Sequence, residues 1–441
     1  MNPRYLLLSI CAVLLAGCGG TPANQVLLMP APDVYEEGNI DPFVDNDPIS
    51  AGGEPRMLYA TDRQPAGPDD KFDYYSDARA NALRVGEARI KLGLDETITW
   101  EEARRISLLK NRTEDYPLEV AEVVEYGPLA RTVRPLDDNI EPRPEPGDRF
   151  AREIDERLAR SANKDVFIYV HGYKVTFENP ILVASELWHF LGYQGAFIAY
   201  SWPSTTRRVA YMSDLDDAAN SARSLRGLIL HIAENTNAER IHVLGYSAGT
   251  RVVSRMLADL GMYGFLMDKD EIERRVRLGN VILVGSDVDR GILGGYLVDG
   301  ALRIPDALTI YQSAQDKALG MSRLVFGKSR SGEAFDPSVT VGPNARRFFE
   351  EHPELRIIDV TNAEGGTAGN GHGYFRSSPW VSSDVLMTLL YDLPPEERGL
   401  ERRDEGGIPT WVFPPDYIER LRVALAKANP ALAGSADASA P

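Results

Sequence analysis

The sequence has little cysteine, few histidines and an excess of acids. Of its 441 residues only Cys11 and Cys18 are cysteines and six are histidines, so neither a disulfide framework nor a cysteine-rich metal site is available. The chain also lacks a P-loop and a dinucleotide fingerprint, and we expect no metal or organic cofactor. The 48 Lys and Arg against 65 Asp and Glu give a net charge of -17, which repels phosphate backbones. Nucleic acid is therefore not an expected partner.

The N-terminus has the pattern of a lipoprotein signal peptide. After Arg4, the apolar stretch 5–15 is shorter than the roughly 20 residues that a membrane-spanning helix needs. It ends in Leu15-Ala16-Gly17-Cys18, which resembles the lipobox whose cysteine is lipidated and becomes the first residue. Acyl chains such as palmitate would anchor Cys18 at about 0.8 kcal/mol per buried CH₂. We expect a cell-envelope protein anchored through Cys18; the alternative is a secreted protein cleaved nearby.

Composition divides the remaining chain into three parts. Residues 19–55 are rich in Gly, Pro, Asn and acids and predict a disordered tether, and residues 429–441 predict a disordered tail. Residues 56–428 alternate short apolar runs with helical patterns, which is typical of crossover units in one mainly parallel α/β sheet. Strands are predicted at 166–170, 196–200, 241–244, 281–284, 308–311 and 355–360, a helix with one apolar stripe at 215–232, and edge strands that could be antiparallel around 57–60, 83–92 and 118–126.

The segment Gly245-Tyr246-Ser247-Ala248-Gly249 fits the G-x-S-x-G nucleophile elbow of the α/β-hydrolase fold. In this turn a serine hydroxyl is exposed between a strand and a helix, and the two glycines leave room for the sharp bend. The motif alone is weak evidence, but it follows the strand pattern at 240–244 and precedes a helical pattern at 250–260. We therefore expect Ser247 to be the nucleophile of an α/β-hydrolase with helices flanking its sheet.

A serine nucleophile needs a histidine base, and in this fold the acid and then the histidine follow the serine. Only His352 and His372 come after Ser247. His352 precedes the 355–360 strand and belongs at its amino end, whereas His372 follows that strand in a glycine-rich loop. Because Ser247 should emerge at the carboxyl edge, His372 is the preferred base.

The acid is expected in a loop that follows a neighbouring strand. Asp316, after the 308–311 strand, is the preferred acid, and Asp287 and Asp289, one strand earlier, are the alternatives. The oxyanion hole would use the N–H of Ala248 and that of Tyr173, with the N–H of Gly172 as the alternative.

Several further residues admit two interpretations. His171 should brace its own loop, while His189, His231 and His242 lie within helix or strand patterns and are read as structural. Trp202 and Pro203 would either bind substrate at the pocket rim or form a packed turn. The apolar cluster 262–267 would be either core packing or a lid over the acyl chain.

These residues resemble a bacterial α/β-hydrolase family of unknown function that is related to esterases and lipases. The resemblance covers about residues 56–395 and rests on the stretches 59–63, 167–173, 200–204, 245–249, 287–289 and 311–319. It implies a Ser/Asp/His hydrolase but names no substrate. Tyr246 and Ala248 depart from the family elbow, which often has histidine and methionine there. Neither change touches the nucleophile, although both reshape its surroundings.

The sequence thus predicts a serine hydrolase that acts on a small-molecule or lipid ester at the cell envelope. Gly19 after the lipidated cysteine favours the outer membrane, facing the periplasm, if the cell is Gram-negative. Two alternatives stay open: a catalytically silent hydrolase fold that serves as an envelope lipoprotein, and an acyltransferase or amidase with the same triad. Neither the oligomeric state nor the acyl chain length follows from the sequence.

Overall fold

The computed structural model describes residues 25–38, 40–43, 56–93, 99–134, 140–205, 211–320, 329–334, 341–366 and 370–428. Cys18, the expected signal peptide and the expected tail lie outside these residues. Within the described part of the chain, no helix is both long and apolar enough to cross a bilayer.

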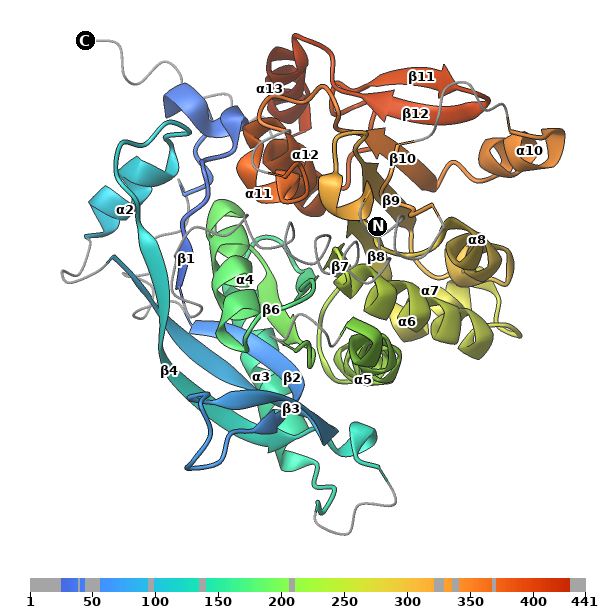
Figure 1. Ribbon diagram of the computed structural model, residues 1–441. Helices are drawn as coiled ribbons and strands as arrows, with labels where there is room; N and C mark the ends of the chain where they lie inside the picture. Colours follow the sequence, from blue (N-terminus) through green and yellow to red (C-terminus); the bar gives the residue numbers. More distant parts are fainter. Residues whose placement is uncertain are drawn as a thin grey trace, which may run out of the picture.

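The centre of the molecule is a parallel sheet (Figure 1). The whole sheet has twelve strands in the order β1-β4-β3-β2-β6-β5-β7-β8-β9-β10-β12-β11, and the run from β2 to β12 is parallel. The six apolar runs expected to be buried strands all form this core. They are β5 (Val166–Val170), β6 (Ala196–Ser201), β7 (Ile241–Tyr246), β8 (Leu278–Val284), β9 (Ala307–Gln312) and β10 (Leu355–Asp359).

Antiparallel strands extend both sides of this parallel core. On the N-terminal side, β2 (Arg56–Pro65), β3 (Tyr75–Leu92), β4 (Pro117–Pro128) and β1 (Gln25–Leu27) pair antiparallel in succession. On the other side, β12 (Ile408–Val412) pairs with β10 and forms a hairpin with β11 (Glu401–Glu405). The α/β class and the N-terminal antiparallel strands are confirmed, whereas the β11–β12 hairpin had no clear apolar pattern to predict it.

Helices cover both faces of the sheet, and strand alternation sends side chains to two separate cores. Ile168 of β5 joins one hydrophobic cluster, with α3 (Glu145–Arg160), α5 (Tyr211–Asn235) and α6 (Gly249–Tyr263). Its neighbour Tyr169 joins the other, with α4 (Glu178–Phe190), α12 (Pro379–Tyr391) and α13 (Tyr417–Ala428). The remaining helical segments are η1 (Asp33–Gly38), α2 (Trp100–Ser107), η2 (Ala130–Thr132), α7 (Lys269–Val276), α8 (Arg290–Val298), η3 (Ala301–Arg303), α10 (Pro343–Glu351) and α11 (Tyr374–Ser377).

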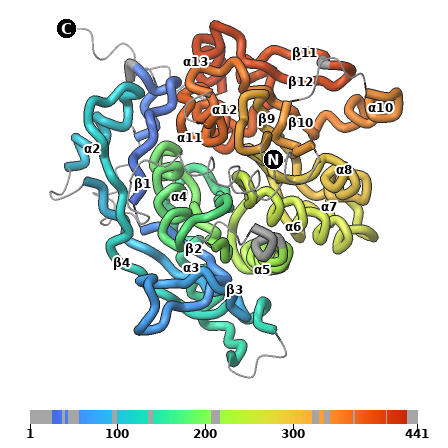
Figure 2. Tube along the Cα trace, viewed as in Figure 1, coloured from blue at the N-terminus to red at the C-terminus, as the bar shows by residue number. Residues whose placement is uncertain are grey.

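One expectation is wrong for the N-terminal segment, defined here as residues 25–38 and 40–43. We expected it to be part of a disordered tether, but β1 pairs with β4, and Met29, Val34 and Tyr35 are buried in the core that contains α4 and α12. In the tube view this segment runs alongside α4 (Figure 2). The segment is too short and irregular to show a period, and its apolar side chains are buried only because α4 and α12 provide a surface for them.

Candidate active site

Ser247 stands at the turn between β7 and α6. Its φ of 51° lies in the left-handed region, which is rare for a residue with a side chain and marks a strained turn. A Cβ on Gly249 would lie 2.2 Å from the backbone oxygen of His171, and one on Gly245 would lie 2.9 Å from Val253 Cγ2. Glycine at 249 therefore lets helix α6 pack against the end of β5, and glycine at 245 leaves room for Val253 of α6 against β7.

His372 faces the serine from a turn beyond β10. Its Nε2 lies 2.8 Å from Ser247 Oγ, and its Nδ1 lies 2.7 Å from Asp316 Oδ2. The ring rests on Gly285 at the end of β8, where a Cβ would come within 3.0 Å of His372 Cε1. Ser247 and Asp316, which precede His372 by 125 and 56 residues, thus meet it at the carboxyl edge of the sheet.

Asp316 lies in the turn after β9, and its side chain is fully buried. One carboxylate oxygen accepts from the His372 ring, and the other accepts a hydrogen bond from the Leu319 N–H at 3.0 Å. A buried carboxylate on Nδ1 fixes the tautomer that leaves Nε2 free to accept the serine proton. The three groups form a continuous hydrogen-bonded chain that could move a proton away from Ser247 Oγ.

The two alternative acids have other partners. Asp287 is 5% exposed and pairs with Arg251 at 3.1 Å and with Arg330 at 3.5 Å. Asp289 caps α8 by accepting from the Ile292 N–H at 3.0 Å. The structure therefore brings Asp316, and neither of these carboxylates, into hydrogen-bonding contact with His372.

The loop that follows β5 packs directly on the elbow. A Cβ on Gly172 would lie 2.9 Å from Ser247 Cβ, so only glycine allows this approach. The half-buried Tyr173 comes next, and Ala248 is the N-cap residue of α6. Both residues lie in segments that adjoin Ser247, where the oxyanion-hole prediction needs them. Their role as oxyanion donors remains a prediction.

Buried side chains hold this loop from behind. His171 Nδ1 lies 2.7 Å from the Gly172 oxygen and its Nε2 lies 3.1 Å from the Trp202 oxygen, which confirms the expected bracing contacts. Burial lowers the pKa of His171, and the nearby Arg63 guanidinium lowers it further. Arg63, from the 59–63 stretch, is itself fully buried and donates to the Val175 oxygen at 2.9 Å.

The expectation that Trp202 and Pro203 bind substrate is wrong in this conformation. Trp202 is 0% exposed, its ring stacks on His171 with centroids 5.3 Å apart, and its Nε1 donates to the His171 oxygen at 2.7 Å. Pro203 is also buried. A residue without accessible surface cannot touch a bound molecule, so the structure favours the alternative, a packed turn.

The apolar cluster 262–267 is mostly exposed, and only Met267 of its large side chains packs against the core. Phe265 is 64% exposed and Leu266 is 92% exposed, so these side chains are not core packing. They follow the C-terminal end of α6, whereas Ser247 precedes its N-terminal end. Fifteen helical residues separate the two ends by about 22 Å. That distance places the cluster beyond reach of the serine.

Two aromatic residues pack around the site, and the sequence indicated a place there for Tyr246 but not for Tyr374. The Tyr246 ring packs 5.2 Å from the His372 ring. The Tyr374 hydroxyl accepts from the Gly285 N–H at 2.7 Å and donates to the Tyr311 oxygen at 3.0 Å. Burial raises the pKa of both tyrosines, so both hydroxyls stay protonated. Only the closeness of Tyr374 to His372 in the sequence could have indicated its place.

The remaining histidines lie away from Ser247. His352 follows α10 at the amino end of β10 and contacts Glu354 at 2.8 Å. His231 and His242 make hydrogen bonds to backbone groups, and His189 contacts the Ser107 hydroxyl. In the described ranges, no three His, Cys, Asp or Glu side chains cluster in a way that could hold a metal ion.

Comparison with known proteins agrees with this α/β fold. The model of the family described as "Alpha/beta hydrolase of unknown function (DUF900)" matches residues 147–390. The chain belongs to this family. The matched region of this α/β-hydrolase contains β5 to β10 together with Ser247, Asp316 and His372.

The chain is also similar to the uncharacterized protein alr1448 of Nostoc sp.. The two are 26% identical over 147 residues, which covers 27% of this chain and 38% of the relative. The chain thus spans well under half of that relative's length.

Proposed function

We propose that this α/β-hydrolase is a carboxylic ester hydrolase that works through an acyl-enzyme on Ser247. Ser247 Oγ attacks the ester carbonyl carbon while its proton passes to His372 Nε2. The tetrahedral intermediate collapses, the bond to the alcohol breaks, and His372 returns the proton to the leaving oxygen. Water then gives its proton to His372 and attacks the acyl carbon. The acid leaves and Ser247 regains its proton.

The observation that carries this proposal is the chain of two hydrogen bonds, 2.8 Å and 2.7 Å long, from Ser247 through His372 to Asp316. The left-handed turn at Ser247 adds support, because such strain is usually found where a side chain has to be presented for function. Asp316 would keep the imidazole oriented and would stabilise its positive charge. The N–H groups of Ala248 and Tyr173 would bind the oxyanion, each worth about 3 kcal/mol of barrier.

We further propose that the protein acts at the cell envelope, anchored through a lipidated Cys18. The lipobox pattern Leu15-Ala16-Gly17-Cys18 supports this proposal, and Gly19 supports the outer membrane as its place in a Gram-negative cell. The substrate would then be a small-molecule or lipid ester that is accessible at that membrane.

Steady-state hydrolysis of nitrophenyl esters with acyl chains of increasing length tests the proposed reaction. We expect turnover by the wild-type protein and a loss of at least about 10⁴-fold in kcat for Ser247→Ala, since the acyl-enzyme cannot form. His352→Ala is the matched control, because His352 lies at the opposite end of β10, and its kcat should stay within about twofold of wild type. Equal rates for wild type and Ser247→Ala would overturn the proposal.

A further inference from the structure

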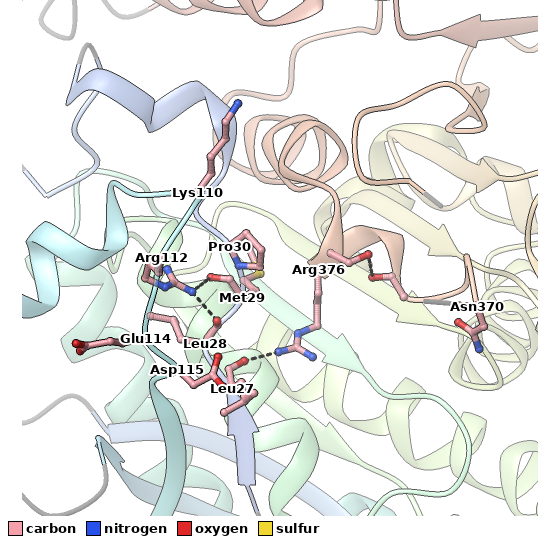
Figure 3. Close-up of a pocket in the computed structure, with 12 residues that line it drawn as sticks. Leu27, Leu28, Met29, Pro30, Lys110, Arg112, Glu114, Asp115, Asn370 and Arg376 are labelled. Atoms are coloured by element: carbon pink, nitrogen blue, oxygen red, sulfur yellow. Dashed lines mark hydrogen bonds between the residues drawn. The ribbon is translucent and has the colours of Figure 1, made fainter. Parts of the chain in front are cut away.

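The N-terminal part of the chain contacts the α/β-hydrolase domain in a groove between the N-terminal segment and the turn that carries His372 (Figure 3). Arg112 and Arg376 on its walls both donate to backbone oxygens of residues 27–29. These contacts hold the N-terminal segment itself. Another contact is made by β2, where the side chain of Arg63 reaches a loop that adjoins Ser247.

Arg63 lies at the same edge of the sheet as Ser247. In the parallel pairing of β2 with β6, Thr61 stands opposite Ser201, so Arg63 comes just beyond the paired residues at the carboxyl end of β2. The pairing of β2 with β3 shifts register on both sides of Arg63. Such irregularities redirect a side chain. Here the Arg63 guanidinium extends past the end of β6 to the loop that follows β5.

The guanidinium group of Arg63 is fully buried and joins two strands to this loop. Its Nε donates to Ser201 Oγ of β6 at 3.0 Å, and its Nη1 donates to the Ser76 oxygen of β3 at 3.4 Å. Its Nη2 donates to the Val175 oxygen of the loop at 2.9 Å. Because these donors belong to one planar fork, the contacts with the strands fix the direction of the contact with Val175.

The loop at 171–176 contains a strained residue. Lys174 has a φ of 66°, a left-handed conformation that is unfavourable for a residue with a side chain and persists only where neighbours enforce it. Its side chain is exposed, so the restraint has to come from the adjoining backbone. Val175, the next residue, is held through both backbone groups: its oxygen accepts from Arg63, and its N–H donates to Ser204 Oγ at 3.4 Å.

The restrained loop packs on the nucleophile elbow, since a Cβ on Gly172 would lie 2.9 Å from Ser247 Cβ. Tyr173, whose N–H is a proposed oxyanion donor, lies between Gly172 and the strained Lys174. The place of this N–H therefore depends on how both ends of the loop are held. A donor of this kind has to stay within about 0.5 Å of its productive position. The hold on Val175 is thus a requirement for the oxyanion hole.

We propose that Arg63 is a positioning residue for the oxyanion hole, which holds the Val175 backbone so that the Tyr173 N–H meets the developing negative charge. This inference rests on the proposed ester hydrolysis. Arg63 is 0% exposed, so it acts through the loop and not by contact with substrate. It also precedes residues 147–390, which match the family model. The strand β2 is therefore part of the catalytic unit.

The test compares full-length wild-type protein with Arg63→Met in the hydrolysis of a nitrophenyl ester. Rates are expressed per active site, titrated to completion with a fluorophosphonate, so that unfolded molecules are not counted. Acylation and deacylation both pass through an oxyanion, and the loss should therefore appear in kcat. We expect kcat per site to fall about 10²-fold and KM to change by less than about threefold, because a donor displaced by about 1 Å fails mainly in the transition state.

The same comparison in a Lys174→Gly background separates positioning from general stability. Glycine adopts a φ of 66° without strain, so the loop then depends less on Arg63. The loss of kcat on Arg63→Met should become at least about fivefold smaller, which is the lower end of the strain that glycine removes. A merely structural role of Arg63 would give the same loss in both backgrounds.

Arg277→Met is the matched control. Arg277 also donates to two backbone oxygens, those of Thr236 and Ala238, but it lies at the amino end of β8, on the opposite edge of the sheet from Ser247. Its kcat per site should equal that of wild type. If Arg63→Met fails to fold, Ser204→Ala removes the hydroxyl that accepts from the Val175 N–H and should lower kcat per site in the same way.

The inference would be overturned by a wild-type kcat per site in Arg63→Met or, if that variant does not fold, in Ser204→Ala. A loss that appears mainly in KM, or an equal loss with and without Lys174→Gly, would also overturn it. Each of these results would leave the proposed function intact as long as the wild-type protein turns over the ester and Ser247→Ala does not. No turnover of any ester by the wild-type protein would refute the proposed function, and this inference with it.

Discussion

Two neighbouring turns at the same edge of the sheet carry buried aspartates with different partners. The turn after β9 places Asp316 on the His372 ring at 2.7 Å, with a backbone N–H on its second oxygen. The turn after β8 places Asp287 between the guanidinium groups of Arg251 and Arg330. Both carboxylates are suitably placed along the chain to be the acid of a triad. Their partners differ. Asp316 faces the imidazole of His372, which has to be oriented, whereas Asp287 faces two guanidinium groups.

The turn after β8 nevertheless serves the elbow. The Asp287 N–H and the Ser286 hydroxyl both donate to Thr250 Oγ1, which in turn donates to the Ser247 oxygen. Gly285 of the same turn forms the floor under the His372 ring. We therefore expect the turn after β9 to take part in the chemistry and the turn after β8 to support the elbow. Substitutions in each turn can test this difference.

The largest expected effect is that of Asp316→Asn. An amide in this place no longer stabilises the imidazolium and can select the wrong tautomer, so kcat for a nitrophenyl ester should fall about 10⁴-fold. The measurement is steady-state kinetics, with circular dichroism to verify the fold. A loss of less than tenfold would show that another group orients His372.

Asp287→Asn should instead act on stability. Removing the charge leaves Arg251 and Arg330 without this partner in a buried site, which costs on the order of 3 kcal/mol. Denaturant unfolding followed by circular dichroism measures this loss. Its kcat should fall far less than that of Asp316→Asn; the opposite ranking of the two variants would reverse the assignment.

Gly285→Ala tests how the turn after β8 supports the His372 ring. The added methyl group would lie 3.0 Å from His372 Cε1, at a residue whose φ of 55° already disfavours a side chain. A displaced imidazole should lower kcat about 10²-fold and leave KM nearly unchanged. Gly294→Ala is a control, since a Cβ there meets nothing within 4 Å. Wild-type kinetics in Gly285→Ala would show that the ring has room to adjust.

Substitution of a third buried aspartate, Asp62, should have the smallest effect, which is on the pH dependence of stability. Burial raises its pKa from 3.8 to about 6, despite a hydrogen bond from Ser221. Between these values the unfolded chain releases a proton that the folded protein keeps, so wild-type stability falls as the pH rises.

Asp62→Asn removes this loss of stability at higher pH, because an amide does not ionise. Relative to wild type, the variant should gain about 2 kcal/mol in free energy of unfolding between pH 4.5 and pH 7.0. Urea unfolding at both pH values measures the difference. A constant difference between the two proteins would contradict a raised pKa at Asp62.

The parallel core could be predicted from the sequence because buried strands read as nearly unbroken apolar runs such as Val166–Val170. Chain order and the edge rule also indicated that Ser247, Asp316 and His372 would meet, since loops after parallel strands share one edge. Apolar runs, chain order and loops that follow strands can all be recognised in one sequence without a structure.

The remaining features depend on contacts that the sequence does not display. Trp202 is a large aromatic residue of the kind that often lines a pocket, yet its ring is stacked beneath the loop against His171. Val34 and Tyr35 belong to a stretch that looks disordered, and only the surface of α4 and α12 allows their burial. The strand Glu401–Glu405 consists entirely of charged residues and pairs only because β12 lies beside it.

Covalent labelling can identify the nucleophile without knowledge of the substrate. The full-length protein is treated with a fluorophosphonate, digested, and examined by mass spectrometry to locate the modified residue. We predict a single adduct on Ser247, formed in His352→Ala as in wild type and absent from Ser247→Ala. An unmodified wild-type protein, or an adduct on a different serine, would contradict the assignment of Ser247 as the nucleophile.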